Sequence, residues 1–150
     1  MRIGEDILGN YVLICSMAAW FTAQLLKIIT GMIKYGRVDY RRVLFASGGM
    51  PSSHASTVSA LCASIAVVEG FGSVAFALSF IFAFIVMYDA TGVRRAAGEQ
   101  AKILNQLVDN LSERRPDYFQ KKLKELIGHT PLEVIAGALL GILVVLLIPT

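Results

Sequence analysis

The sequence predicts an all-α integral membrane protein, a bundle of four transmembrane helices. The chain has 150 residues, of which 55% are hydrophobic and only 17% are charged. The hydrophobic residues are gathered into long runs and the charged residues lie between them, which is typical of polytopic membrane proteins rather than of a soluble core. At this length we expect one membrane-embedded domain over residues 1–150.

The four apolar runs are close to the length that crosses a bilayer. They are Tyr11–Ile33, a short Ala- and Ser-rich run from His54 or Ala55 to Val68, Phe71–Tyr88 and Leu132–Ile148. About 20 apolar residues cross the hydrocarbon core as a helix, so the second and fourth runs are near the lower limit. Glu69–Gly72 is predicted to be a tight turn. Acidic Glu5 and Asp6 favour a retained first helix over a cleaved signal peptide.

Two polar stretches, Lys34–Pro51 and Asp89–Pro131, separate these runs. The second contains two amphipathic helical patterns, Val93–Leu111 and Asp117–Ile127, with Pro116 between them. We expect these helices to lie on the membrane surface or to cap the bundle.

Positive charge is concentrated in the two polar stretches. Every Lys and Arg except Arg2 and Lys27 falls within them. The positive-inside rule puts both stretches in the cytoplasm and both termini outside, in a bacterial-type plasma membrane or an organellar membrane. The same distribution accounts for the net charge of +3. The sequence has no basic stripe with interleaved aromatic residues, so we do not expect a nucleic-acid partner. Cys15 and Cys62 fall inside apolar runs and are expected to act as small hydrophobic residues.

The polar clusters that look chemical all fall at one predicted membrane face. The first is Gly48-Gly49-Met50-Pro51-Ser52-Ser53-His54. Two glycines let the backbone approach a ligand, and Ser52 and Ser53 at a helix N-terminus form a ready anion site. His54 is suited to give a proton to a leaving group. The alternative is an ordinary Gly-Pro turn with serine caps.

The second cluster is His129-Thr130-Pro131-Leu132-Glu133, directly before the fourth run. The spacing of four residues lets the Glu133 carboxylate meet the His129 imidazole, fix its tautomer and raise its nucleophilicity. An acid within the membrane is costly unless it is paired. An interfacial His beside a Glu that reaches toward water is the alternative.

Cations near these clusters are candidate ligands for phosphate oxygens. Lys34 and Arg41 follow the first run, and Asp89, Arg94 and Arg95 follow the third. Arginine suits bidentate contacts with phosphate, and lysine acts as a point charge. Asp89 could orient an Arg or a His. Each of these residues is also explained by topology or by helix capping.

These residues resemble the type 2 phosphatidic acid phosphatase superfamily, which includes the vanadium haloperoxidases. Its first motif, Lys-x6-Arg-Pro, matches Lys34 and Arg41, with Arg42 in place of Pro. Its second, Pro-Ser-Gly-His, reads Pro51-Ser52-Ser53-His54. Its third, Ser-Arg-x5-His-x3-Asp, matches at His129, with Glu133 for Asp and Leu123 for Arg. The short chain resembles the divergent PAP2 subset.

The resemblance implies a membrane lipid phosphatase that needs no metal or other cofactor. His129 would attack phosphorus and form a phosphohistidine, Glu133 would orient His129, and His54 would protonate the departing alkoxide. Lys34, Arg41, Ser52 and Ser53 would bind the phosphate oxygens. Arg94 or Arg95 is our candidate for the missing third-motif Arg, and Lys122 and Lys124 are the rivals.

The predicted substrate is a phosphomonoester lipid such as phosphatidylglycerophosphate, phosphatidate or a polyprenyl phosphate. The alternative is a non-catalytic membrane protein that binds anionic lipid headgroups or partners, and a small transporter has little support. Gly137 and Gly141 form a Gly-x-x-x-Gly pair. It suits close helix packing within the bundle, or between protomers of a homo-oligomer.

Overall fold

The computed structural model describes residue 7 and residues 9–35, 49–112 and 128–150; at residues 34, 35, 93–95 and 109–112 it describes the backbone alone. The helices are α2 (Tyr11–Tyr35), α4 (Ser53–Glu69), α5 (Val74–Thr91), α6 (Val93–Ser112) and α7 (Pro131–Leu147). No strand occurs among the described residues, so this part of the chain confirms the all-α class.

Each predicted apolar run is a helix, and local capping decides where the helices begin and end. Ser52 begins α4, because its hydroxyl accepts from the Ala55 amide at 3.3 Å. Gly70 ends α4 with φ 84°, a conformation that suits glycine. The hydroxyl of Ser73 then accepts from the Phe76 amide at 3.1 Å. This cap starts α5 at Val74, three residues after the predicted start at Phe71.

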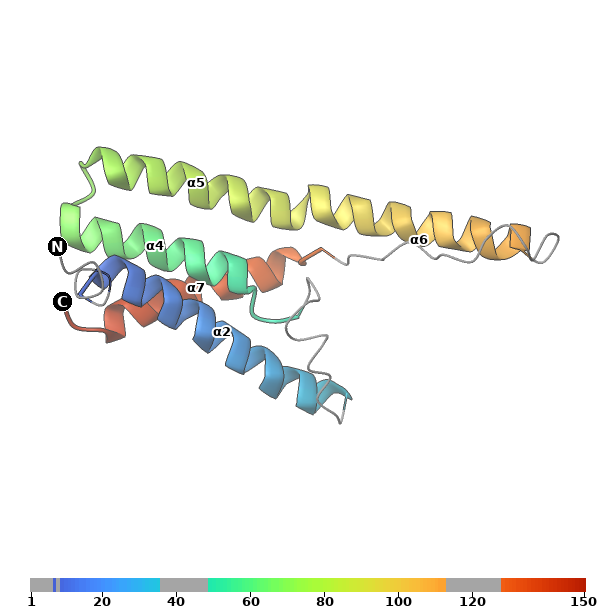
Figure 1. The fold of residues 1–150 in the computed structure, drawn as a ribbon, viewed down its shortest axis with the longest axis horizontal. Helices are drawn as coiled ribbons and strands as arrows, with labels where there is room; N and C mark the ends of the chain where they lie inside the picture. The colour runs from blue at the N-terminus through green and yellow to red at the C-terminus, as the bar shows by residue number, and fades with distance from the viewer. Residues whose placement is uncertain (1–6, 8, 36–48, 113–127) are drawn as a thin grey trace.

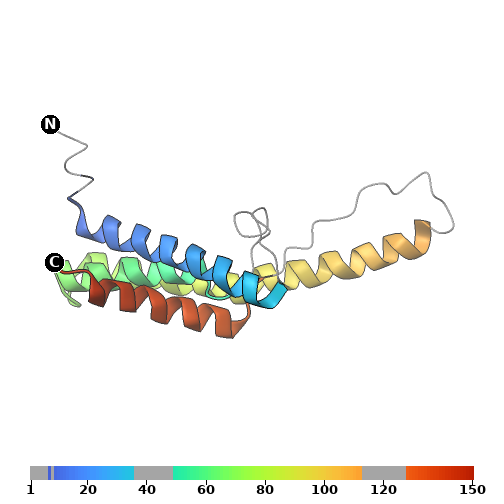
Figure 2. The same cartoon turned by 90° about the horizontal axis from the view of Figure 1, so that it is seen from below.

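Helix α4 occupies the centre of the bundle and packs against α2, α5 and α7. Helices α4 and α7 run in the same direction, and α2 and α5 run in the opposite one (Figures 1 and 2). The starts of α4 and α7 therefore lie at the same end of the bundle as the end of α5. The polar clusters that precede α4 and α7 are brought together by this arrangement.

Small residues let α7 approach α4 closely. A Cβ added at Gly137 would collide with the carbonyl of Ser52, and one at Gly141 would collide with the carbonyl of Ser56. The Gly-x-x-x-Gly pair thus packs against another helix of the same chain. This is the first of the two predicted alternatives, packing within the bundle or between protomers. Ser56 also donates its hydroxyl to the Ala19 carbonyl of α2 at 3.1 Å. The two cysteines are buried in neighbouring apolar clusters, as predicted.

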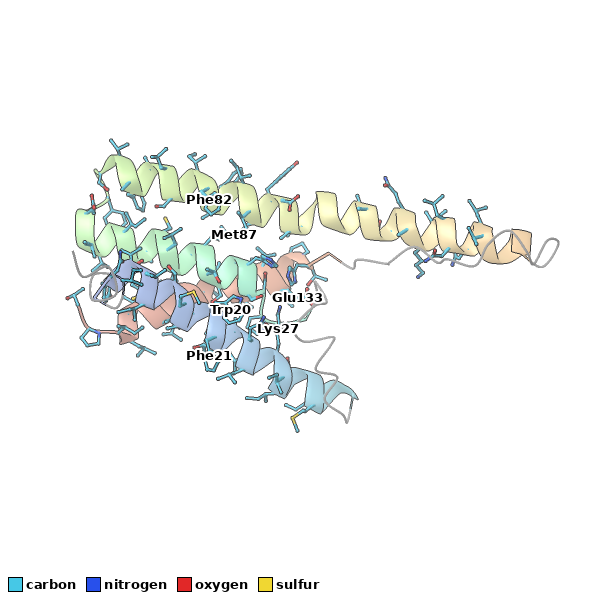
Figure 3. All side chains as sticks on the ribbon, in the orientation of Figure 1. Trp20, Phe21, Lys27, Phe82, Met87 and Glu133 are labelled. Carbon is cyan, nitrogen blue, oxygen red and sulfur yellow. The ribbon has the colours of Figure 1, made fainter. Side chains whose placement is uncertain are left out.

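The outward surface of the bundle is rich in large apolar side chains, especially along α5, where Phe80, Phe82 and Phe84 are all more than half exposed. Figure 3 shows Phe82 on α5 and Phe21 on α2. Two helical stretches, Tyr11–Ile33 and Val74–Val108, are long and apolar enough to cross a membrane, and Pro131–Leu147 is a shorter apolar helix. Large apolar residues outside and small residues inside are typical of helix packing in lipid.

Helix α6 confirms the first amphipathic helix that the sequence predicts. It continues beyond the bundle in line with α5 and does not cover the bundle end (Figure 1). Its apolar residues Ile103, Leu104 and Leu107 are exposed. The second predicted helix, Asp117–Ile127, lies outside the described residues.

Candidate functional site

Backbone hydrogen bonds tie together the three segments that surround the candidate site. The Ser52 amide, at the start of α4, donates to the Glu133 carbonyl of α7 at 2.9 Å. The His129 amide donates to the Ala90 carbonyl in the last turn of α5 at 3.1 Å. Side chains from these segments are therefore positioned by main-chain contacts, which vary less than contacts between flexible side chains.

The start of α4 is anchored by Ser52. This residue is fully buried, its amide binds α7 and its hydroxyl caps α4. Ser53 follows at the first helical position, where the amide has no carbonyl one turn earlier within the helix. Such an amide and the positive end of the helix dipole favour an anion. Of the two serines, Ser53 is thus the better placed to meet a ligand, while the described contacts of Ser52 hold helices together.

The start of α7 is a capping box that also holds an imidazole. The Thr130 hydroxyl accepts from the Glu133 amide at 3.3 Å, and Glu133 Oε2 accepts from the Thr130 amide at 3.0 Å. The same Oε2 lies 3.2 Å from Nδ1 of His129. A carboxylate there favours the tautomer with hydrogen on Nδ1 and a lone pair on Nε2. This is the contact that the spacing of four residues predicted.

The two histidines are neighbours. The ring centroids of His54 and His129 lie 6.0 Å apart in an edge-to-face arrangement. His129 is only 2% exposed, whereas His54 lies on the exposed side of the first turn of α4. One imidazole is thus fixed in the protein interior, and the second lies beside it at the surface.

Lys27 is a candidate site residue that the superfamily motifs do not include. It lies in the second half of α2, is only 8% exposed, and its Nζ donates to the Ser53 hydroxyl at 3.1 Å. It is also within electrostatic reach of Glu133, and the two side chains lie near each other in Figure 3. A charged residue inside an apolar run is itself a sequence signal of function, and this signal points to Lys27.

The structure describes only some of the remaining predicted cations. Lys34 lies in the last turn of α2, about 10 Å beyond Lys27 along the helix axis at 1.5 Å per residue. Arg94 and Arg95 lie in the first turn of α6. For these three residues the backbone alone is described. Arg41, Lys122 and Lys124 lie outside the described residues.

Asp89 lies in the last turn of α5, next to Ala90, whose carbonyl accepts from His129. Asp89, the predicted orienting residue, is therefore at the same end of the bundle as His129. Among the described residues, no three His, Cys, Asp or Glu side chains come together in a way that would hold a metal ion.

Comparison with known proteins agrees with the motifs. Residues 8–144 match the model of the divergent PAP2 family. The chain is 44% identical to a Bacillus subtilis protein described as the uncharacterized membrane protein YuiD, over 95% of this chain and 96% of the relative. No solved structure matches the chain significantly. The family match over nearly the whole chain shows that this protein belongs to the divergent PAP2 family.

Proposed function

We propose that this protein is a membrane-embedded phosphatase that hydrolyses a lipid phosphomonoester through a phosphohistidine intermediate. One observation carries the proposal. Nδ1 of His129 lies 3.2 Å from the Glu133 carboxylate, and the His129 ring lies 6.0 Å from the ring of His54. An oriented nucleophile with a second imidazole beside it is the arrangement that nucleophilic catalysis with general acid assistance requires.

In the first step, Nε2 of His129 attacks phosphorus and the bond from phosphorus to the lipid oxygen breaks. His54, as imidazolium, gives its proton to the departing alkoxide. Glu133 keeps hydrogen on Nδ1 and stabilises the positive charge that develops on the ring. A reactive approach places nucleophile and phosphorus about 3–3.5 Å apart. Two rings with centroids 6.0 Å apart are both able to reach one phosphoryl group.

In the second step, water attacks phosphorus and the bond from phosphorus to Nε2 breaks. His54, now neutral, takes a proton from the water, and inorganic phosphate leaves. The oxygens of the phosphoryl group would be held by Ser53 and by the cations Lys34, Arg41, Arg94 and Arg95, as the family motifs and chain positions suggest.

We further propose that α2, α4, α5 and α7 all span the membrane, with the site facing the cytoplasm and both termini outside. At 1.5 Å per residue, the 17 residues of α4 and of α7 extend about 25 Å, close to the thickness of the hydrocarbon core. The concentration of Lys and Arg between 34–42 and between 94–124 supports this orientation.

Phosphate release from lipid substrates tests the proposal. Purified full-length protein in nanodiscs is mixed with phosphatidate, phosphatidylglycerophosphate or a polyprenyl phosphate. We expect the wild type to release phosphate from at least one of them, and His54→Gln to slow release by about 10²–10⁴-fold, as expected for a lost general acid. A wild type that releases none from the panel would overturn the proposal in favour of a non-catalytic protein that binds headgroups.

A further inference from the structure

Lys27 is the strongest feature that the motifs leave unexplained. It lies between Leu26 and Ile28 in an apolar helix and is 8% exposed. Burying an ammonium group costs much free energy unless other groups compensate its charge. The groups around Lys27 therefore indicate what its charge is used for.

The side chain of Lys27 is fixed by the loop that leads into α4. Its Nζ donates to the Ser53 hydroxyl at 3.1 Å, and a Cβ at Gly49 would lie 3.9 Å from its Cγ. One turn further along α2, the Thr30 hydroxyl donates to the Met50 carbonyl at 2.9 Å. The loop from Gly49 to Ser53 thus follows the surface of α2 beside Lys27, and the position of the ammonium group is determined before any ligand binds.

A role as counterion for Glu133 accounts for only part of this geometry. Glu133 Oε2 already accepts from the Thr130 amide and contacts Nδ1 of His129. The direct bond of Lys27 goes instead to a neutral hydroxyl, that of Ser53. An ammonium group has three N–H donors, and a hydroxyl compensates its charge only weakly.

The charge of the proposed substrate also favours a cation at the position of Lys27. A phosphomonoester carries a charge of about −1.5 to −2 at neutral pH. Lys27 contributes one positive charge and Glu133 one negative charge, so Lys27 offsets the repulsion between Glu133 and an incoming dianion. The Lys27 ammonium contacts the hydroxyl of Ser53, the residue before His54, and the His54 ring lies 6.0 Å from the His129 ring.

We infer that Lys27, together with the Ser53 hydroxyl, binds the phosphoryl oxygens of the substrate. Lys27 thereby supplies the positive charge that is missing because Leu123 replaces the Arg of the third superfamily motif. The inference rests on the proposed phosphatase function and names its phosphate-binding residue. It also gives a reason for Ser53, which stands where the superfamily motif has Gly. Its hydroxyl binds the Lys27 side chain, which a glycine could not do.

Kinetics with Lys27→Met and Lys27→Arg test this role. Met keeps the length of the side chain and removes the charge, so we expect kcat/KM for lipid phosphate to fall by about 10²-fold or more. Arg keeps the charge and should recover part of the loss. Lys102→Met, which removes an exposed cation of α6, is the matched control and should stay within about threefold of the wild type.

Anion binding without turnover separates this inference from the proposed function. Inorganic phosphate and orthovanadate are titrated into the full-length protein, and protection against thermal unfolding is measured. We expect Lys27→Met to weaken the binding of both anions by at least about tenfold. Ser53→Ala should weaken their binding by a smaller factor. If Lys27→Met does not fold, Lys27→Gln, which also removes the charge, and Ser53→Ala give the same comparison.

The outcomes are distinct. Wild-type affinity for phosphate in the folded Lys27→Met variant, with normal kcat/KM, would overturn the inference and leave the phosphatase in place. Anion binding that depends on Lys27, in a protein that hydrolyses no lipid phosphate, would support the binding site and overturn the phosphatase. A wild type that binds neither anion and releases no phosphate from the lipid panel would overturn both.

Discussion

The two ends of the bundle are held together by different forces. At the end where α2 begins, Cys15, Ala19, Ala60, Val144 and Val145 form a tightly packed apolar cluster. At the other end, hydrogen bonds cross between helices: Ser52 to Glu133, His129 to Ala90 and Lys27 to Ser53. Buried polar groups are more costly in lipid than packed small residues. The difference leads to a testable comparison, in which the apolar end provides stability and the polar end provides the proposed chemistry.

The largest expected effect is a loss of activity at the polar end. His129→Asn keeps an N–H donor near Glu133 but removes the nucleophilic Nε2. We expect lipid phosphate hydrolysis to fall by about 10³-fold or more. Phosphate release is measured together with the melting temperature in the same detergent. Loss of folding in step with loss of activity would show that this end also carries stability, against the comparison.

Glu133→Gln is expected to have a smaller effect on activity. Gln at this position still completes the capping box with Thr130, so α7 should keep its start. The charge-assisted bond to His129 is lost, and such bonds contribute about 1.5–3 kcal/mol, or roughly 10–150-fold in rate. The measurement is kcat for lipid phosphate. Unchanged kcat would show that Glu133 only caps the helix.

Gly141→Val tests the packing of α7 on α4. The added side chain meets the Ser56 carbonyl, a backbone atom that cannot move aside. We expect a loss of about 1–3 kcal/mol in the free energy of unfolding, as for other overpacked sites. Leu146→Ala, at a residue of the same helix that is 74% exposed, is the control and should change stability by less than about 0.5 kcal/mol. Equal stability of both variants would contradict close α4–α7 packing.

Tyr11→Phe gives the smallest predicted change. The Tyr11 hydroxyl donates to the carbonyls of Val145 and Ile148 at 3.3 and 3.0 Å. Removing it should reduce the free energy of unfolding by about 0.5–1.5 kcal/mol and leave phosphate release unchanged. Chemical denaturation and the lipid assay are run in parallel. Reduced activity without reduced stability would show that the two ends are coupled.

Most of the fold could be predicted because apolar runs and caps are local features. The bounds of α2, α4 and α7 lie within two residues of the predicted runs. The start of α5 was wrong by three residues, since hydropathy includes Phe71 whereas the Ser73 cap excludes it. The partner of Gly137 and Gly141 could not be predicted, because a face of small residues does not reveal which helix packs on it.

The candidate site was predicted where its residues are close in sequence. His129 and Glu133 are one turn apart, so their contact follows from helix geometry. Lys27 was missed as a site residue because it meets Ser53 only through the packing of α2 on α4. A basic residue in α2 has no partner in its own segment that would reveal this contact. The roles of Arg41, Arg94 and Arg95 stay predictions.

The hydrogen bond from the Ser52 amide to the Glu133 carbonyl has a consequence for biosynthesis. It joins the residue before α4 to a residue of α7, which is translated after α2, α4 and α5. A nascent chain in which α2, α4 and α5 are already inserted still lacks both His129 and the contact that fixes the start of α4. Under the proposed function, newly made protein would therefore release no phosphate from lipids before α7 has been inserted.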